Sequence, residues 1–472
     1  MDIKNFLNTV CEQIKYKPVR NGISEELEQH IKDIKEEYII NGIDEKQAEE
    51  KAILQMGNAE EIGKKLNKIH KPKLDWKLIL LISILIGFGI FATFLRASPQ
   101  EGIYVGNVGN VILYAIIGLI LSIGIYFFDY KKIKKYSLLI YIISTILMVL
   151  PLLGIGGSIN GYYYIRFLGL SFFSATITLP LYLISFIGFI IEYKKDNVRK
   201  LQLCGKEIKL NKDLLKIIIL SSISLLLMMF MPSVANMVIL GCAYLIVLTI
   251  KIIKNKEHMA RNLGILYGII FAMIFFLIVI GILNASFRIE RIIYSFNPND
   301  APSGQGYIGM LQKEILQNAK VIGQAENITF PIDESILRLE SNLTFIYLIG
   351  KCGLLVAGLL VITIILTSIR LIFNARNIKE QYGKFLVIGL GSLFILQSFT
   401  TVLMNINLGI QTNVSLPFVT YGGVYLIINM MSIAVILSVY RRKDINVMGT
   451  TSNCNRIGLH IGNWIVNIEK NK

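Results

Sequence analysis

The residues of this chain that could do chemistry lie mostly in the connections between long apolar segments. Arg166, Arg288 and Arg291 are three of them, and a guanidinium can hold a phosphate group through paired, charge-assisted hydrogen bonds. At a membrane interface the same side chains could equally anchor lipid headgroups, so both interpretations stay open. Lys351 is the one charge well inside an apolar segment, where an ionisable group is either functional or extends its ammonium group to the interface.

The run S-L-P-F-V-T-Y-G-G at residues 415–423 is a second candidate. Its proline and glycines break a helix within an apolar stretch, and irregular backbone at membrane depth is tolerated only where it is buried or lines a cavity. We therefore interpret Pro417, Tyr421, Gly422 and Gly423 as part of a cavity wall. The three tyrosines at 162–164 would provide a sugar-stacking platform, although an aromatic belt at the interface is the simpler interpretation.

Membrane-spanning helices must position these residues. Of the 472 residues, 54% are hydrophobic and 17% are charged, whereas a soluble domain has about 45–50% apolar and about 25% charged residues. Repeated apolar runs of about 18 or more residues can cross a hydrocarbon core about 30 Å thick, which excludes a soluble enzyme, a disulfide-rich secreted domain and a disordered chain. We predict an all-α polytopic membrane protein with ten transmembrane helices, at residues 78–95, 111–128, 136–154, 174–191, 214–231, 234–250, 263–283, 343–369, 385–403 and 417–440.

The distribution of charge predicts the orientation of these spans. The net charge of +16 is concentrated in every second connection, which is the positive-inside pattern and places both termini in the cytosol. No basic cluster carries the interleaved aromatics of a nucleic-acid binder, and the five cysteines lack the spacing of a metal site or disulfide framework. One predicted outward connection, residues 284–342, has about 59 residues, and connections this long are generally functional or disordered.

Residues 1–76 are predicted to form a separate cytosolic domain of three or four short helices, with no cleavable signal peptide before it. We expect Ser24 to cap a helix that Gly42 ends, and Asp44 and Asn58 to cap two further helices. Residues 77–443 then form the membrane domain, and residues 444–472 a cytosolic tail.

Four stretches on the predicted outward side resemble the SEDS family (shape, elongation, division and sporulation), which includes FtsW, RodA and SpoVE. Residues 160–172 are similar to the family's N-G-x-R-R-W-I-x-L-G…F-S-F, and residues 291–307 to the start of its large outer loop. Residues 341–354 resemble T-D-F…I-G-E-x-x-G-L at the head of the eighth helix, and residues 416–423 are close to L-P-F-I-S-Y-G-G. The resemblance covers residues 78–443, while residues 1–70 resemble the helical prefix of some Firmicute permeases and regulators.

The resemblance implies a role in bacterial cell-wall synthesis during division, elongation or sporulation. Family members polymerise lipid II, the undecaprenyl-pyrophosphate-linked precursor of peptidoglycan, and usually work with a class B penicillin-binding protein. This glycosyl transfer needs a carboxylate to deprotonate the acceptor hydroxyl, and cations or hydrogen-bond donors to hold the departing pyrophosphate. The substrate-binding candidates are then Asn160, Arg166, Arg288, Arg291, Lys351, Pro417, Tyr421, Gly422 and Gly423. The cofactor stays unassigned, although a divalent cation could take part.

The sequence departs from the family where the family carries charge. Asn342 stands at the position of the proposed catalytic Asp in an ungapped alignment, and Thr344 stands there with a two-residue gap. Neither side chain can take up a proton at neutral pH. Ser233 and Thr176 stand where the family has an Asp and a Glu, and Glu340 is a candidate for a substitute base.

Three functions therefore stay open. The chain could be a glycosyltransferase that uses a displaced carboxylate, a non-catalytic partner or regulator that binds lipid II, or a transporter of lipid-linked precursors. Transport would require charged groups along the cytosolic half of the spans, and the predicted spans lack them. The Lys-, Ile- and Asn-rich composition favours the plasma membrane of a low-GC Gram-positive bacterium.

Overall fold

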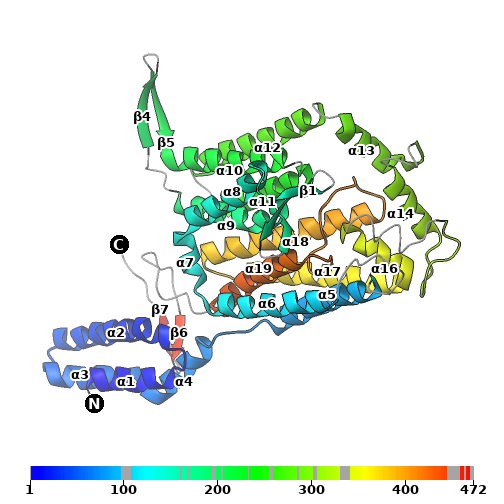
Figure 1. Ribbon diagram of the computed structural model, residues 1–472. Coiled ribbons are helices and arrows are strands. Elements are labelled where there is room, and N and C mark those ends of the chain that lie inside the picture. The colour runs from blue at the N-terminus through cyan, green and yellow to red at the C-terminus, as the bar shows by residue number, and fades with distance from the viewer. Residues whose placement is uncertain are drawn as a thin grey trace. The chain divides into compact units, whose positions relative to one another are not determined.

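The computed structural model (Figure 1) describes residues 2–96, 108–159, 162–167, 170–193, 198–203, 206–231, 233–254, 259–283, 286–300, 306–329, 341–443, 458–461 and 464–467. The chain divides into two compact units. The prefix unit comprises Met1–Leu74, Asn377–Glu380 and Tyr440–Lys472, and the membrane unit comprises Asp75–Arg376 and Gln381–Val439.

Four helices make up most of the prefix unit: α1 (Ile3–Gln13), α2 (Arg20–Ile40), α3 (Glu45–Met56) and α4 (Ala59–Ile69), with a hairpin of β6 (Gly458–Ile461) and β7 (Trp464–Asn467). The Asp44 and Asn58 side chains accept backbone hydrogen bonds at the starts of α3 and α4, as predicted. The predicted cap at Ser24 is wrong, because α2 already begins at Arg20, directly after a 3-10 turn at Lys17–Val19 that contains a proline. Proline favours the start of a helix because its φ is already helical.

A small apolar core holds the prefix helices together. Phe6, Val10 and Ile14 of the α1 segment pack with Ile23 and Ile31 of α2, and each of these side chains is at most 1% exposed. Burying a side chain of this size contributes about 1.5–3 kcal/mol. The helical spacing of these residues is what the sequence predicts.

The membrane unit is built from apolar helices: α5 (Trp76–Arg96), α6 (Val108–Phe127), α7 (Tyr130–Lys135), α8 (Ser137–Leu152), α9 (Ser174–Glu192), α10 (Lys212–Phe230), α11 (Val234–Lys254), α12 (Met259–Leu283), α16 (Thr344–Cys352), α17 (Leu354–Arg376), α18 (Gln381–Asn405) and α19 (Gly423–Arg441). Among the described residues, eight helices are long and apolar enough to cross a membrane. The α8 helix and the apolar part of α12, Gly264–Val279, are shorter and coincide with the two remaining predicted spans. The protein is therefore an all-α, multi-pass membrane protein.

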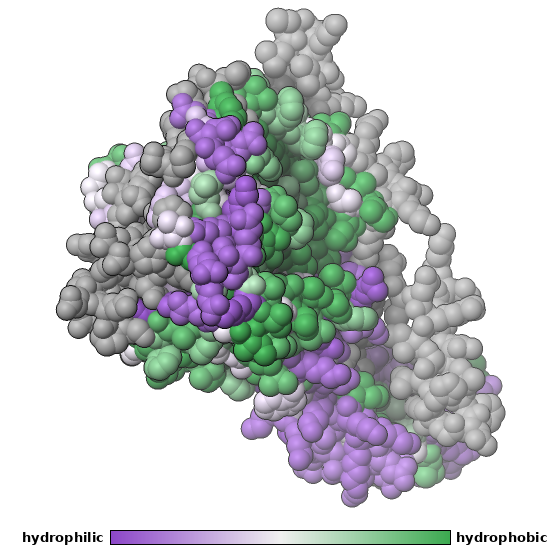
Figure 2. Space-filling model, turned by 90° about the vertical axis from the view of Figure 1, so that its right-hand side faces the viewer, coloured by the Kyte–Doolittle hydropathy of each residue, from purple (hydrophilic) through white to green (hydrophobic). Residues whose placement is uncertain are grey.

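The α9 and α18 helices form the centre of this unit, whereas α6 is peripheral. In the most apolar 18-residue stretch of each helix, 83% of the residues of α9 are buried, but only 11% of those of α6. Gly389 of α18 allows close packing on α9, because a Cβ there would lie 2.7 Å from the Ile187 side chain. Small residues are typical of such contacts between membrane helices. Hydrophobic residues cover a broad area of the membrane unit on the face drawn in Figure 2.

The predicted single span at 343–369 is wrong, because it is two helices. Gly353 separates α16 from α17 with a φ of +91°, a conformation that favours glycine. A segment of the long outward connection, residues 320–325, lies against the break: the Leu354 N–H donates to the Lys320 carbonyl (2.9 Å), and the Ala325 N–H donates to the Gly350 carbonyl (2.8 Å). These bonds satisfy backbone groups that a break in an apolar helix would otherwise leave unpaired.

The predicted outward connections contain further structure. Three strands, β1 (Gly157–Ile159), β2 (Tyr162–Phe167) and β3 (Leu170–Phe173), form an antiparallel sheet that the sequence analysis did not predict. The long connection contains α13 (Ser286–Phe296), α14 (Tyr307–Gln317) and the 3-10 turns Pro298–Asp300 and Ser341–Leu343. On the predicted cytosolic side, β4 (Val198–Leu203) pairs with β5 (Lys206–Asn211).

A buried ion pair joins the predicted cytosolic ends of α5 and α17. The Asp75 carboxylate accepts two hydrogen bonds from Arg370 Nε (each 3.0 Å), one from Arg370 Nη2 (2.7 Å) and one from Asn374 Nδ2 (2.6 Å). It also accepts from the Leu78 N–H and so caps α5. Because this carboxylate is fully paired, it is a structural clamp between the two helices.

Candidate functional site

Asn342 lies in the short turn before α16 and is 4% exposed. Its Nδ2 donates to the Thr412 carbonyl (2.6 Å), in the connection between α18 and α19. That carbonyl can only accept, so the amide nitrogen must be the atom that faces it. The Asn342 Oδ1 is buried and has no partner among the described residues. The side chain therefore acts as a donor that holds this connection against α16.

Asn405, at the end of α18, supports the same turn. Its Oδ1 accepts from the Ile346 N–H (3.0 Å), and its Nδ2 donates to the Asn342 carbonyl (3.0 Å). The Asn405 side chain thus supplies the N-terminal cap of α16 from another helix. Asn342 itself does not cap α16, because its amide nitrogen donates to the Thr412 carbonyl instead.

Polar side chains connect this turn to the long outward connection. The Gln411 backbone N–H donates to Ser295 Oγ on α13 (3.0 Å), and Gln411 Nε2 donates to Gln312 Oε1 on α14 (2.7 Å). Gln312 is fully buried. Gln411 directly precedes Thr412. The helices α13 and α14 and the Asn342 side chain therefore hold adjacent residues of the connection between α18 and α19.

Arg96, the last residue of α5, is a buried cation at this end of the unit, 4% exposed. Its Nη2 donates to Thr344 Oγ1 (3.0 Å), and its guanidinium carbon lies 5.0 Å from the centre of the Tyr347 ring. Its Nε is buried with no partner in the described part of the chain. No carboxylate among the described residues pairs with this guanidinium, and burial of an unpaired charge is costly, so Arg96 is a strong candidate for binding an anion.

Ser233 and Thr176 also meet in space, although they are 57 residues apart in the chain. Asn236 of α11 is fully buried, and its Nδ2 donates to Ser233 Oγ (2.8 Å) and lies 3.4 Å from Thr176 Oγ1. The two positions at which the resemblance expects carboxylates therefore form one neutral cluster. An amide with two hydroxyls can orient a ligand, but it supplies neither a base nor a metal ligand of high affinity.

The run at residues 415–423 folds into a tight turn before α19, as its proline and glycines predict. The Leu416 N–H donates to Thr420 Oγ1 (2.8 Å), and Tyr425 Oη donates to the Ser415 carbonyl (2.8 Å). Gly89 of α5 lies directly against this turn, since a Cβ there would be 2.5 Å from the Phe418 carbonyl oxygen. The turn is therefore fixed on both sides.

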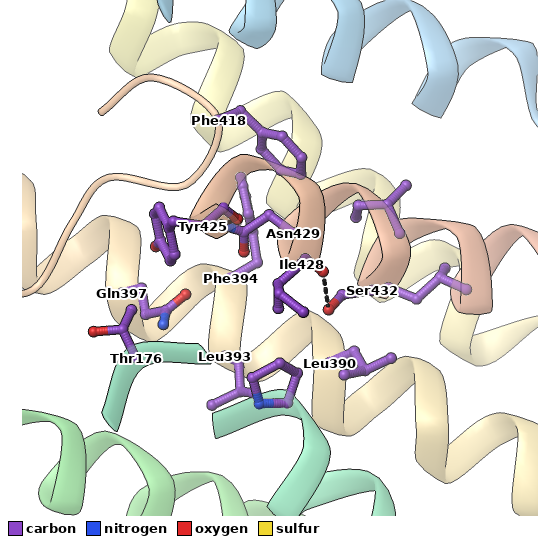
Figure 3. A pocket seen from close by; sticks show the side chains of 13 residues that line it. Thr176, Leu390, Leu393, Phe394, Gln397, Phe418, Tyr425, Ile428, Asn429 and Ser432 are labelled. Atoms are coloured by element: carbon purple, nitrogen blue, oxygen red, sulfur yellow. Dashed lines mark hydrogen bonds between the residues drawn. The ribbon is translucent and has the colours of Figure 1, made fainter. Parts of the chain in front are cut away.

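Two small cavities adjoin this turn. One of about 20 Å³ lies between α9, α18 and α19, and Figure 3 shows the side chains of Thr176, Gln397 and Asn429 around it. The other, of about 10 Å³, is lined partly by Tyr421, Gly422 and Gly423. The first could hold about one water molecule, whereas ligand sites occupy about 300 Å³ or more. The described residues around the turn thus form no groove large enough for a sugar.

A larger, open hollow of about 360 Å³ lies between α13, α14 and the residues that follow α18. Lys313, Gln317 and Asn407 supply its polar groups, and Phe296 supplies an aromatic ring. The Asn407 Oδ1 is buried without a partner in the described residues. An aromatic face beside amides and an ammonium group suits a sugar that carries a phosphate.

Comparison with known proteins identifies the family. Residues 74–445 match the family described as cell cycle protein, which groups FtsW, RodA and SpoVE. The chain belongs to the SEDS family. This is a membrane family of peptidoglycan glycosyltransferases in cell division and cell shape, and residues 1–73 lie outside the match.

Individual SEDS proteins align over most of this chain. The probable peptidoglycan glycosyltransferase FtsW of Trichlorobacter lovleyi is 23% identical over 395 residues, which cover 79% of this chain and 96% of that protein. The stage V sporulation protein E of Bacillus subtilis is 24% identical over 373 residues, covering 77% and 94%.

Two solved structures share the fold. The rod shape determining protein RodA of Thermus thermophilus matches with a TM-score of 0.53 and 15% identity over 78% of this chain and 97% of that one. A chain from a peptidoglycan synthase complex, studied for how it coordinates polymerization and crosslinking, matches with a TM-score of 0.59 and 17% identity over 78% and 98%.

The predicted site residues of this SEDS protein are only partly described. Asn160 and Glu340 lie outside the described residues, and only the backbones of Arg166 (in β2) and Arg288 (in α13) are described. Arg291 is exposed on α13, and Lys351 lies in the last turn of α16, beside the helix break. The structure brings Asn342 and the 415–423 turn to the same connection between α18 and α19.

The sequence analysis missed Arg96, Asn236, Gln397 and Asn405. Two amides inside predicted spans, Asn236 and Gln397, were a usable signal, because polar groups at membrane depth are expensive and commonly functional. Within the described part of this SEDS protein, no group of three or more His, Cys, Asp or Glu could hold a metal ion. No residue is therefore assigned to a divalent cation.

Proposed function

We propose that this SEDS protein binds lipid II at the predicted outer end of its membrane unit and acts in cell-wall synthesis as a partner that does not itself polymerise the precursor. The observation that supports this most directly is the hydrogen bond from Asn342 Nδ2 to the Thr412 carbonyl (2.6 Å). The position of the expected base is occupied by a donor that is already bonded to the backbone. It can neither accept the proton of an acceptor hydroxyl nor turn toward one without losing this bond.

Few of the described carboxylates could act as the base in place of a residue at position 342. Among the described residues of the membrane unit, the one acid that is fully buried is Asp75, at the other end of α5 and about 30 Å from Arg96 by helix length. Glu314 of α14 is half-buried, and its Oε1 accepts from the Thr329 N–H (2.5 Å). This oxygen is therefore taken up by the backbone of the long connection, and the Glu314 Oε2 is buried.

Binding of the precursor needs cations for the pyrophosphate and a surface for the sugars. Arg96 supplies a buried guanidinium next to Thr344, and the hollow at Lys313 supplies an ammonium group beside the Phe296 ring. Both cations lie at the predicted outer end of the membrane unit. Because the cavities near the 415–423 turn are small, the hollow between α13 and α14 is the better candidate for the sugars.

Polymerisation is the second candidate function, because the FtsW relative is described as a probable peptidoglycan glycosyltransferase. The candidate base is then Glu340, two residues before Asn342. The proposed protein partner is a class B penicillin-binding protein, and a related chain was solved within a peptidoglycan synthase complex. We place the protein in the plasma membrane with both termini in the cytosol, on the basis of the charge pattern.

Purified full-length protein and fluorescent lipid II would test this. We expect wild type to bind lipid II and to form no glycan strands on a gel, with or without a class B penicillin-binding protein. Arg96→Met should weaken binding about 10- to 100-fold, as expected for a lost charge-assisted contact. Lys216→Met, which removes a cation at the predicted cytosolic end, should leave binding unchanged. Polymerisation by wild type that Glu340→Gln abolishes would instead identify a glycosyltransferase.

A further inference from the structure

A long apolar groove runs between α11, α17 and α18, away from Asn342. Its volume is about 370 Å³. The walls are mainly aliphatic side chains, among them Ile246, Ile250, Leu371, Ile372, Val387 and Ile395. Apart from two cations, Ser392 is the one polar residue among the described residues that line it, and its hydroxyl already donates to the Gly389 carbonyl (2.7 Å). The groove therefore offers an apolar ligand nothing but hydrocarbon contact along its length.

The two cations lie at one end of this groove. Arg376 is the last residue of α17, and Lys384 is in the first turn of α18. The two helices are consecutive and packed together, so these side chains meet at the same end. Neither forms an ion pair with a described carboxylate. The positive end of the α18 dipole also disfavours the Lys384 ammonium, and a bound anion would relieve this.

The length of the groove matches one leaflet of a membrane. From Lys384 to Leu396, α18 rises by about 18 Å at 1.5 Å per residue. One leaflet of hydrocarbon is about 15 Å thick, half of the usual core of about 30 Å. The charge pattern predicts that the end with Arg376 and Lys384 faces the cytosol.

We propose that this groove binds one anionic glycerophospholipid of the cytosolic leaflet. One acyl chain lies along α18 between α11 and α17, and the phosphate lies between the Arg376 guanidinium and the Lys384 ammonium. The charge at one end and the aliphatic walls favour this occupant over a helix from a second copy of the chain.

Native mass spectrometry of the full-length protein in mild detergent tests this site. After incubation with equal amounts of phosphatidylglycerol and phosphatidylcholine, wild type should retain about ten times more phosphatidylglycerol than phosphatidylcholine. The double variant Arg376→Gln, Lys384→Gln should lose this preference. The matched control Lys131→Gln, Lys132→Gln removes two exposed cations from the same predicted side and should keep it. Equal retention of the two lipids by wild type, or an equal loss in both double variants, would overturn the proposal.

Gly391→Leu tests the apolar part of the groove. A Cβ at Gly391 would lie 3.5 Å from the Leu371 Cβ, an ordinary contact, so the substitution should fold and fill the space. We expect retention of both lipids to fall about tenfold, with elution from a sizing column unchanged. Unchanged lipid retention, or a dimer that this variant dissociates, would contradict an acyl-chain site. Lipid II binding should persist in every variant, which separates this result from the proposed function.

Discussion

Asn342 stands, in an ungapped alignment, at the position of the family's proposed catalytic Asp, and its amide offers different chemistry from a carboxylate. The amide donates to a backbone carbonyl that an ionised carboxylate would repel, because both atoms would be acceptors. The residue is thus adapted to holding the connection between α18 and α19. Arg96 and Thr344 place a guanidinium and a hydroxyl close by, so groups for holding an anion persist.

Asn342→Asp tests both properties of this position. Loss of the bond to Thr412, together with burial of an unpaired carboxylate, should reduce stability by about 1–3 kcal/mol. The same variant should gain polymerisation of lipid II, since a positioned base is worth about 10²–10⁴-fold in rate. Differential scanning fluorimetry and a gel of glycan products measure the two effects. Asn299→Asp, at an exposed asparagine, is the control; equal melting temperatures for the two variants would refute the role assigned to Asn342.

At the scale of elements, the turn at 415–423 is positioned by close contact with α5 and α6. Gly89 packs on the Phe418 carbonyl, and Gly423 packs on the Tyr114 ring, with a Cβ at Gly423 only 2.2 Å from ring carbons. The helix break at Gly353 is positioned in the same way, by backbone from the long connection. Irregular backbone at these two places is thus held by contact with another segment of the chain.

Gly89→Val should displace this turn. The new methyl groups would press on backbone rather than on a flexible side chain, and overpacking of this kind costs about 1–3 kcal/mol or more. We expect a lower melting temperature and weaker lipid II binding. The control is Gly87→Val on the same helix, where a Cβ meets nothing within 4 Å. Equal effects from the two substitutions would mean that Gly89 acts through helix propensity alone.

The prefix helices should form an independent unit. Residues 1–72, expressed alone, are expected to be soluble and helical by circular dichroism, because the apolar core described above is internal to them. Val10→Asp should unfold this fragment, since Val10 is fully buried, whereas Ile40→Asp should not, since Ile40 is 85% exposed. A disordered spectrum of the wild-type fragment would show that it needs the rest of the chain.

For the whole molecule, the alternating basic connections predict a single orientation in the membrane. In a cysteine-free background, an impermeant maleimide added to intact cells should label cysteines introduced at Ser303 or Gln324. It should not label those at Lys132 or Lys379 until the cells are opened. Labelling of Lys379→Cys in intact cells, with protection of Ser303→Cys, would reverse the topology and remove the basis for an outward-facing site.

The sequence by itself determined what depends on near neighbours in the chain. Apolar runs gave the spans, Asp44 and Asn58 gave helix starts, and proline with glycines gave the turn before α19, because these patterns act within a few residues. The break at Gly353 could not be predicted, since its backbone partners lie about thirty residues away in the long connection. Ser24 failed as a cap because a stronger signal, the preceding proline, already starts the helix.

Only the tertiary structure decided the composition of the site. Its hydrogen-bonded pairs are far apart in the sequence: Arg96 and Thr344 are separated by 248 residues, Asn342 and Thr412 by 70, and Asn236 and Thr176 by 60. Such pairs depend on how the helices pack. The local spacing of residues in the sequence does not indicate which buried polar groups will face each other. The sequence therefore determined the family and most of the spans, and it predicted an amide at the position of the expected acid. Packing decided that the Asn342 amide holds the connection between α18 and α19, because a buried donor must find an acceptor.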